Sequence, residues 1–259
     1  MCTKRILWLV GLLFPVLLFA QKAKNVELNV VFVGNSITQG ALLADPAQEA
    51  PPVQTVNWLR QQPGMKKVEY SNQGVSGATT VDFLPASQAL FPKVKQAAEN
   101  LTKQNPKSLL LFSMMLGTND SAIKGPNGSP VSPQQYYTNV KAIIDELLTA
   151  NPKALFVLHR PVWYSPNTYN GAMYLREGLN RLESYLPQLR ILASAYEAKY
   201  PNQIFIGDTD AFEYFKVHHM TDVTAEEGNA GTFYLHPNKK GAESLGKFWG
   251  NAIYKVLMK

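Results

Sequence analysis

Cysteine is almost absent from this sequence, because Cys2 is the only one among 259 residues. A disulfide needs two cysteines, so the chain cannot form one within itself, and beyond position 2 no thiolate is available for chemistry. The stability of the fold must therefore come from its hydrophobic core. Internal repeats, low-complexity tracts and long linkers are also lacking, and the length suits one domain or two with a sizeable core.

Charge of one sign is not concentrated anywhere in the chain. The sequence has 25 Lys and Arg against 19 Asp and Glu. Without Lys4 and Arg5, which precede a long apolar segment, 23 basic residues remain and the formal charge is +4. Because these residues are spread along the chain, they favour a solvated surface over a nucleic-acid site. We expect no nucleic-acid partner, and the sequence leaves the oligomeric state open.

The longest apolar run, Ile6–Ala20, lies near the N-terminus, between two basic residues and a polar pair. A basic start, a short apolar stretch and a small residue at its end are typical of a secretory signal peptide. A membrane span would need about 20 apolar residues. We therefore expect a signal peptide over residues 1–20 and one domain over residues 21–259. The protein is expected to be secreted or periplasmic, without stable membrane insertion after cleavage.

Shorter apolar runs alternate with helical patterns along the rest of the chain. The runs are too continuously apolar for surface strands, and they fit a parallel sheet that is covered on both faces. Strands that alternate with helices predict an α/β fold, a three-layer α/β/α sandwich. The predicted strands are Asn29–Val33, Val68–Ser71, Ser108–Met115, Ala154–Leu158 and Ile204–Ile206.

Two of the helical patterns carry further signals. Ser132 and Gln135 have the spacing of a capping box, and Pro133 occupies the first helical position between them. Near the end of the chain, apolar residues between Leu245 and Val256 repeat at helical spacing. We expect this last helix to lie against the sheet.

Four short motifs, rich in glycine and polar residues, are spread through the chain. The first and third directly follow apolar strand patterns, the second follows a weaker one, and the fourth precedes the last helix. Active sites of open α/β sheets gather at the carboxyl ends of the strands, so we expect these motifs to converge in space. The motifs are Gly34–Thr38, Asn72–Gly77, Gly117–Asp120 and Leu235–Asn238.

Together the motifs contain the groups that acyl transfer requires. Ser36, directly after a strand, can expose its hydroxyl as a nucleophile, and His236 can act as its base. Gly77 permits close approach of a backbone N–H, and the Asn119 amide supplies another donor for the oxyanion formed on an ester. Singly, each residue has an ordinary structural explanation: a helix cap for Ser36, a turn for Gly77 and an Asx-turn for Asn119.

In this order, the four motifs resemble the consensus blocks of the SGNH hydrolases, also called GDSL-type esterases. The family name lists the residue types matched here by Ser36, Gly77, Asn119 and His236. The resemblance implies a flavodoxin-like five-stranded parallel sheet in the order 2-1-3-4-5. It also implies that the backbone N–H of Ser36 is the third oxyanion donor. The chain most resembles the carbohydrate-deacetylating esterases of glycan-degrading bacteria.

The sequence departs from the family pattern at the residue that usually orients the histidine. The usual motif is Asp-x-x-His, but Phe233 stands three positions before His236. We expect Phe233 to pack in the interior and another group between Asp208 and Leu235 to orient the imidazole. A backbone carbonyl from the flexible Gly228–Gly231 stretch is slightly favoured over the nearby acids. The acids in this segment are Asp208, Asp210, Asp222, Glu226 and Glu227.

Residues after the fourth predicted strand are weaker candidates for substrate contact. His159, Trp163 and Tyr164 could border the cleft, with the aromatic rings stacked on a sugar, although packing in the core is an equally good interpretation. His218 and Asp222 are four positions apart, and two such groups are poor evidence for a metal site. We expect neither a metal nor another cofactor.

These observations predict a secreted serine esterase that works through an acyl-enzyme on Ser36. The resemblance favours O-acetyl groups on carbohydrates as the substrate. A lipid or lysophospholipid ester is the first alternative. An inactive SGNH fold that binds glycans is the second, suggested by Phe233, although a binding protein has no need of oxyanion donors.

Overall fold

A parallel sheet of five strands lies at the centre of the computed structural model, which describes residues 25–259. The strand order is β2-β1-β3-β4-β5, and all four neighbouring pairs are parallel. The predicted flavodoxin-like order is therefore confirmed. The strands are β1 (Val26–Gly34), β2 (Met65–Gly74), β3 (Leu109–Met115), β4 (Leu155–Leu158) and β5 (Ile204–Ile206).

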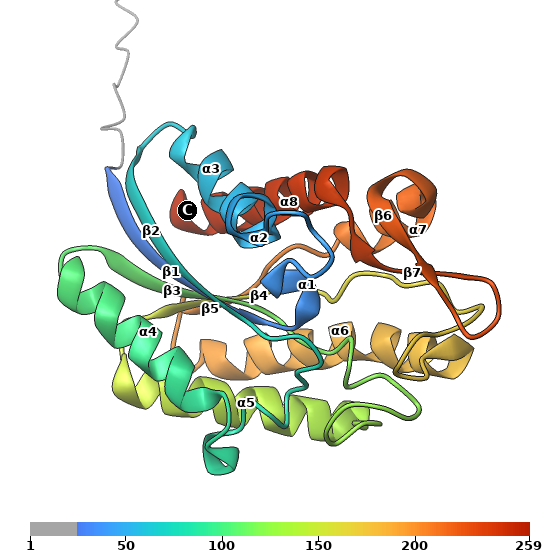
Figure 1. Ribbon diagram of the computed structural model, residues 1–259. Coiled ribbons are helices and arrows are strands. Elements are labelled where there is room, and N and C mark those ends of the chain that lie inside the picture. Colours follow the sequence, from blue (N-terminus) through green and yellow to red (C-terminus); the bar gives the residue numbers. More distant parts are fainter. Residues whose placement is uncertain (1–24) are drawn as a thin grey trace, which may run out of the picture.

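Helices cover both faces of this sheet. α3 and α8 lie on one face, and α4, α5 and α6 lie on the other, which gives the three expected layers (Figure 1). Ser132 caps α5 by accepting the backbone N–H of Gln135, as the capping-box pattern predicts. The helices are α1 (Ser36–Gln39), α2 (Pro46–Glu49), α3 (Pro51–Arg60), α4 (Phe91–Gln104), α5 (Pro133–Ala150), α6 (Leu175–Glu197), α7 (Ala211–Asp222) and α8 (Lys239–Leu257), and a short 3-10 helix, η1, spans Pro85–Ser87.

The core is built on the apolar strands of the sheet. Residues 30–33 of β1 are fully buried, because helices cover both faces of this strand. Trp249 of α8 stacks on Phe32 with a distance of 6.2 Å between ring centroids. Burial of such side chains is worth roughly 1.5–3 kcal/mol each. The last helix therefore lies against the sheet, as its apolar spacing predicts.

A two-stranded antiparallel hairpin follows α7, in a segment where the sequence predicts no strand. It consists of β6 (Val223–Glu227) and β7 (Thr232–Pro237), and Glu226 pairs with Phe233 in its register. β6 has the sequence VTAEE, which carries no apolar run. Its strand conformation depends on pairing with β7, so the local pattern could not reveal it.

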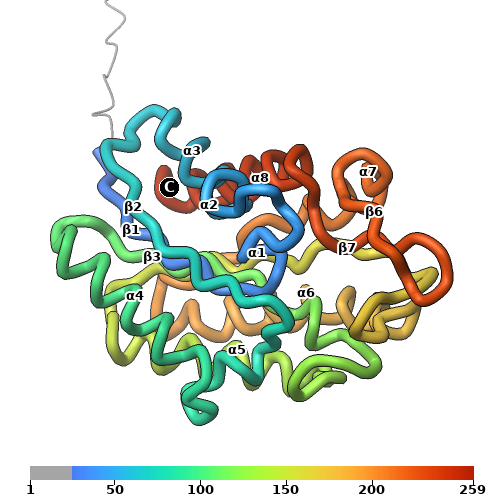
Figure 2. Tube along the Cα trace, viewed as in Figure 1, coloured from blue at the N-terminus to red at the C-terminus, as the bar shows by residue number. Residues whose placement is uncertain are grey.

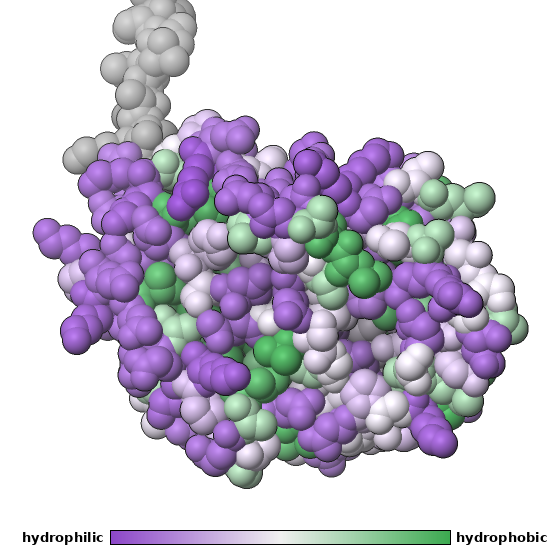
Figure 3. All heavy atoms as spheres, in the orientation of Figure 1, coloured by the Kyte–Doolittle hydropathy of each residue, from purple (hydrophilic) through white to green (hydrophobic). Residues whose placement is uncertain are grey.

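The structure describes no residue of the predicted signal peptide, because residues 1–20 lie outside the described part of the chain. Within residues 25–259, no helix is both long and apolar enough to cross a membrane. On the face drawn in Figure 3, hydrophilic residues cover most of the surface and apolar residues form separate small patches.

The first two motifs meet at the carboxyl ends of β1 and β2. Gly34 and Gly74 are register partners at these ends. A Cβ on Gly74 would collide with the backbone nitrogen of Gln39 in α1, so glycine is required for this close approach. α1 in turn contacts β7, although the two are about 200 positions apart in the sequence (Figure 2). The fold thus brings the first, second and fourth motifs together.

This packing predicts that Gly74→Ala destabilises the fold by about 2–3 kcal/mol, because backbone atoms of α1 must move to admit the methyl group. Gly77→Ala is the matched control in the same loop. A Cβ there meets open space, so only the left-handed φ of +77° adds a cost, of about 1 kcal/mol. Urea unfolding measures both free energies. Equal losses for the two variants would contradict the close approach at Gly74.

Candidate active site

Ser36 is the first residue of α1 rather than its cap. Asn35 is the N-cap, and its Oδ1 accepts the backbone N–H of Ile37 at 3.1 Å. The helix-cap explanation for Ser36 is therefore wrong. Because the first N–H groups of a helix have no partner within it, the backbone N–H of Ser36 is left available to an external acceptor. Ser36 is buried, with 8% of its surface exposed.

His236 stands at the end of β7 and contacts the Ser36 hydroxyl directly. Its Nε2 lies 2.9 Å from Ser36 Oγ. This distance suits a hydrogen bond in which the neutral imidazole accepts the serine proton. The structure therefore brings together the serine of the first motif and the histidine of the fourth.

The group that orients His236 is a carboxylate. Glu226 Oε1 lies 2.8 Å from His236 Nδ1 and also accepts the backbone N–H of His236 at 3.1 Å. The slight preference for a backbone carbonyl is therefore wrong, and Glu226, one of the acids considered, takes this position. Phe233 is fully buried, as predicted. The acid lies on the partner strand, in register with Phe233, because the hairpin places β6 beside β7.

The environment of Glu226 favours its ionised form. Burial alone would raise the pKa of this carboxyl group, but hydrogen bonds from His236 and Asn170 and the charge of His236 lower the pKa below its usual value. Asn170 Nδ2 donates to Glu226 Oε2, the oxygen that does not contact His236. Sequence reasoning missed Asn170, because no local pattern links it to the hairpin.

Asn119 is held by two hydrogen bonds that leave one amide proton unused. Its Nδ2 donates to the carbonyl oxygen of Ala78 at 2.9 Å, and its Oδ1 accepts the hydroxyl of Tyr174 at 2.8 Å. An asparagine amide has two N–H donors, so one remains for a further acceptor. The Asx-turn explanation is wrong, because Oδ1 binds Tyr174 instead of a nearby backbone N–H.

Gly77 stands in a tight turn that needs its conformational freedom. The turn is closed by the backbone N–H of Ala78, which donates to the carbonyl oxygen of Val75. Gly77 has a φ of +77° and open space around its α-carbon. This φ is typical of the third position of a type II turn. The turn explanation for Gly77 and its expected role as a backbone N–H donor are therefore compatible.

Asp120, the last residue of the third motif, binds the loop that follows the second motif. It is fully buried, and its Oδ1 accepts both the backbone N–H and the hydroxyl of Thr80. Burial raises the pKa of this carboxyl group to about 6, although the hydrogen bonds from Thr80 act in the opposite direction. Asp120 therefore fixes the loop that contains Gly77 against the loop that contains Asn119.

His159 is a core residue and does not line a substrate cleft. It is 1% exposed, it stacks on Trp249, and its Nδ1 accepts the backbone N–H of Asp208 at 3.0 Å. Nε2 must then carry the proton, which it donates to Ser113 Oγ at 3.0 Å. Burial lowers the pKa of His159 to about 3. The expectation of a substrate contact here is wrong.

The two aromatic candidates after β4 are also packed inside. Tyr164 is fully buried and its hydroxyl contacts Ser121 Oγ, so it cannot stack on a sugar. Trp163 is 7% exposed and packs against the ring of His219. The packing interpretation therefore holds for both residues. The sequence could not separate the two possibilities, because aromatic side chains occur both in cores and on binding surfaces.

Within residues 25–259, no group of three His, Cys, Asp or Glu side chains could hold a metal ion. His218 packs on the ring of Tyr214, while Asp222 binds Tyr214, Thr221 and Lys240. The pair therefore has other partners in the structure.

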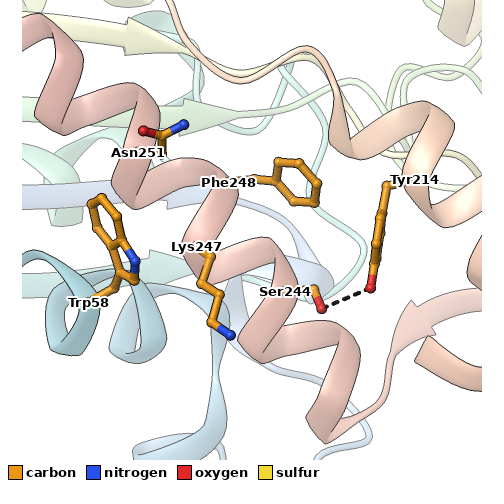
Figure 4. A pocket seen from close by; sticks show the side chains of 6 residues that line it. All are labelled: Trp58, Tyr214, Ser244, Lys247, Phe248 and Asn251. Carbon is orange, nitrogen blue, oxygen red and sulfur yellow. Dashed lines mark hydrogen bonds between the residues drawn. The ribbon is translucent and has the colours of Figure 1, made fainter.

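A separate groove of about 400 Å³ runs along the outer face of α8. Trp58 of α3 and Tyr214 of α7 stand on its two sides, and a hydrogen bond of 3.2 Å joins Tyr214 to Ser244 of α8 (Figure 4). None of the residues that line it belongs to the Ser36 site.

The sheet order and the contacts among Ser36, His236 and Glu226 define an SGNH-type α/β hydrolase. The chain belongs to the GDSL-like lipase/acylhydrolase family, whose sequence model matches residues 32–243. It is therefore a member of an esterase and acylhydrolase family. None of the curated proteins compared with this chain matches it.

Solved structures of esterases share this fold. Est24, a carbohydrate acetylesterase from Sinorhizobium meliloti, has a TM-score of 0.60 at 15% identity, over 89% of this chain and 100% of Est24. A putative arylesterase from Agrobacterium tumefaciens has a TM-score of 0.57 at 16% identity, over 88% and 99%. A two-domain esterase active on acetylated mannans gives 0.54 at 17% identity, over 90% of this chain and 50% of that one.

The burial of His159 predicts a stability that falls in acid. Its pKa is about 3 in the fold, against 6.5 ordinarily, so only the unfolded chain gains this proton as the pH falls from about 6.5 to about 3. Asp120 and Asp208, with pKa values raised to about 6 by burial, act in the opposite direction between about pH 6 and pH 4. The variant His159→Gln isolates the contribution of the histidine, because glutamine retains a donor and an acceptor but cannot titrate.

We expect His159→Gln to reduce the loss of unfolding free energy between pH 7 and pH 5 by about 2 kcal/mol relative to the unmodified protein. Urea unfolding at the two pH values measures this difference. An unchanged loss would contradict a neutral, buried His159.

Proposed function

We propose that this protein is a secreted serine esterase that removes O-acetyl groups from carbohydrates through an acyl-serine intermediate. The observation that carries the proposal is the continuous contact from Glu226 through His236 to Ser36, with distances of 2.8 and 2.9 Å. Secretion rests on the signal-peptide pattern of residues 1–20 in the sequence.

In the first half of the reaction, Ser36 Oγ attacks the ester carbonyl while His236 Nε2 accepts the hydroxyl proton. The negative oxygen that forms is stabilised by three donors: the backbone N–H of Ser36, the backbone N–H of Gly77 and the free amide N–H of Asn119. Glu226 stabilises the imidazolium and holds its orientation. The C–O bond then breaks, and His236 returns the proton to the departing alcohol.

In the second half, water replaces the alcohol. His236 removes a proton from the water, whose oxygen attacks the carbonyl of the acyl-serine. The oxyanion again uses the same three donors. Collapse of this intermediate releases the carboxylic acid, and the proton on His236 returns to Ser36 Oγ. The chemistry uses only groups of this chain and water.

The acetylated carbohydrate is the finer part of the proposal, and it rests on similarity. Est24 is described as a carbohydrate acetylesterase and the two-domain esterase as active on acetylated mannans. Because Trp163 and Tyr164 are buried, they give this substrate no stacking surface. The aligned acid, base and nucleophile also weigh against an inactive binding protein, because binding alone needs no such chain of contacts.

We expect Ser36→Ala to lower the turnover of an aryl acetate by several orders of magnitude while the fold persists. The hydroxyl forms the intermediate, and the cap of α1 belongs to Asn35, so little stability is lost. Assays with the aryl acetate measure the rate, and a fluorophosphonate probe should label the unmodified protein but not the variant. Retention of more than about a tenth of the activity would remove Ser36 from its role.

Glu226→Gln should lower kcat by about 10³–10⁴-fold, since the corresponding change in serine proteases costs about 10⁴-fold through the wrong histidine tautomer. Glu227→Gln is the matched control: this neighbouring carboxylate is exposed and should leave kcat unchanged. Steady-state kinetics compares the two variants. Equal kcat values for the two variants would mean that the contact between Glu226 and His236 has no role in catalysis.

For the substrate class, we expect faster hydrolysis of acetylated sugars and polysaccharides than of esters with long acyl chains. Acetate release and fatty-acid release, measured at equal ester concentration, give the ratio. A preference for long acyl chains or lysophospholipids would replace the carbohydrate proposal by the lipid alternative, with the same acyl-serine chemistry.

A further inference from the structure

One short segment contacts both parts of the candidate active site. This segment, Asn170–Tyr174, lies in the connection between β4 and α6. At its start, Asn170 Nδ2 donates to Glu226 Oε2, and at its end the Tyr174 hydroxyl donates to Asn119 Oδ1 at 2.8 Å. The orienting acid and the side-chain oxyanion donor are therefore both held from the same few residues.

The backbone of this segment is itself anchored. Met173 and Lys124 form an antiparallel bridge, in which the Met173 N–H donates to the Lys124 carbonyl at 2.7 Å. Beside it, a Cβ on Gly125 would lie only 2.6 Å from the Cβ of Ala172. The segment and the loop that contains Gly125 are therefore in close contact at a position where a side chain would not fit. The segment is thus tied to the loop that follows Asn119.

Tyr174 has little freedom to move. The residue is 3% exposed, and its ring stacks on Phe233 with 5.7 Å between ring centroids and an interplanar angle of 15°. The next residue, Leu175, has a φ of +54°. Such a conformation is strained in a residue other than glycine and persists only where its surroundings hold it. The hydroxyl of Tyr174 is therefore fixed opposite Asn119.

We propose that Asn170 and Tyr174 are positioning residues of this active site, an inference that rests on the proposed function. Tyr174 holds the Asn119 amide in one orientation and draws electron density toward Oδ1, which makes the remaining N–H a better donor to the oxyanion. Asn170 fixes the second oxygen of Glu226, so that the first stays aligned with His236 Nδ1. Both residues act through another side chain and touch no reacting atom.

The buried ring of Phe233 has a part in this arrangement. It stands where the SGNH hydrolases usually carry the acid, and it supports Tyr174 instead. The acid is supplied by Glu226, its register partner on β6. Tyr174 thus packs on Phe233, which stands in the place of the usual acid. Asn170 holds Glu226, the acid that orients the histidine instead.

The test for Tyr174 is a double-mutant cycle with Tyr174→Phe and Asn119→Ala. A hydrogen bond is worth about 1 kcal/mol, so Tyr174→Phe should lower kcat for an aryl acetate about 5–10-fold with unchanged KM. In the Asn119→Ala background the same change should have no further effect, because its partner is gone. Tyr196→Phe is the control, since its buried hydroxyl binds Asp145 on α5.

The test for Asn170 is the cycle of Asn170→Ala with Glu226→Ala. Asn170→Ala should lower kcat several-fold in the unmodified protein and have no effect where Glu226 is absent. Asn167→Ala is the matched control, because Asn167 Nδ2 donates to the backbone of the same hairpin, at Thr232, without contact to the carboxylate. Thermal unfolding of all variants confirms that they remain folded.

Additive effects in both cycles, a change in KM instead of kcat, or losses equal to those of the two controls would overturn the inference. Its failure is distinguishable from that of the proposed function. If the unmodified protein hydrolyses no ester, or if Ser36→Ala remains active, the proposed function fails and the inference with it. If activity depends on Ser36 while the cycles are additive, only the inference fails.

Discussion

The hydrogen bond between Glu226 and His236 is the contact on which the rest of the site depends. A free imidazole can rotate and exchange tautomers, so a base that must accept a proton at Nε2 needs an acceptor at Nδ1. Glu226 Oε1 supplies it and also binds the backbone N–H of His236. The same oxygen therefore fixes both the ring and the main chain of the histidine.

The hairpin that carries this contact is held in place by hydrogen bonds from another segment of the chain. Residues 165–170, between β4 and α6, bind along it: Ser165 pairs with Tyr234, the Thr168 hydroxyl accepts the N–H of Ala230, and Asn170 binds the carboxylate itself. An isolated two-stranded hairpin is marginally stable in water. The extra hydrogen bonds of this connection thus contribute to the rigidity that an orienting acid requires.

Much of the fold could be predicted from the sequence, because its strands are short apolar runs that can only be buried. The five parallel strands and the last helix are found where these patterns lie, with ends shifted by a few residues. The residues of the four motifs were also identifiable. Three of the motifs follow the ends of parallel strands, which lie at one edge of the sheet, and the fourth precedes the last helix.

The sequence by itself thus determined the layers of the fold, the family, and the set Ser36, Gly77, Asn119 and His236 that the fold gathers. Only the tertiary structure decided that Glu226 orients the histidine, that Asn170 and Tyr174 support the site, and that His159 and Tyr164 are buried. The reason is physical: a buried apolar strand or a helix cap depends on residue types that are neighbours in sequence, which a local pattern records. A hydrogen bond between residues 55 positions apart, such as that of Tyr174 with Asn119, depends on packing that no local pattern contains.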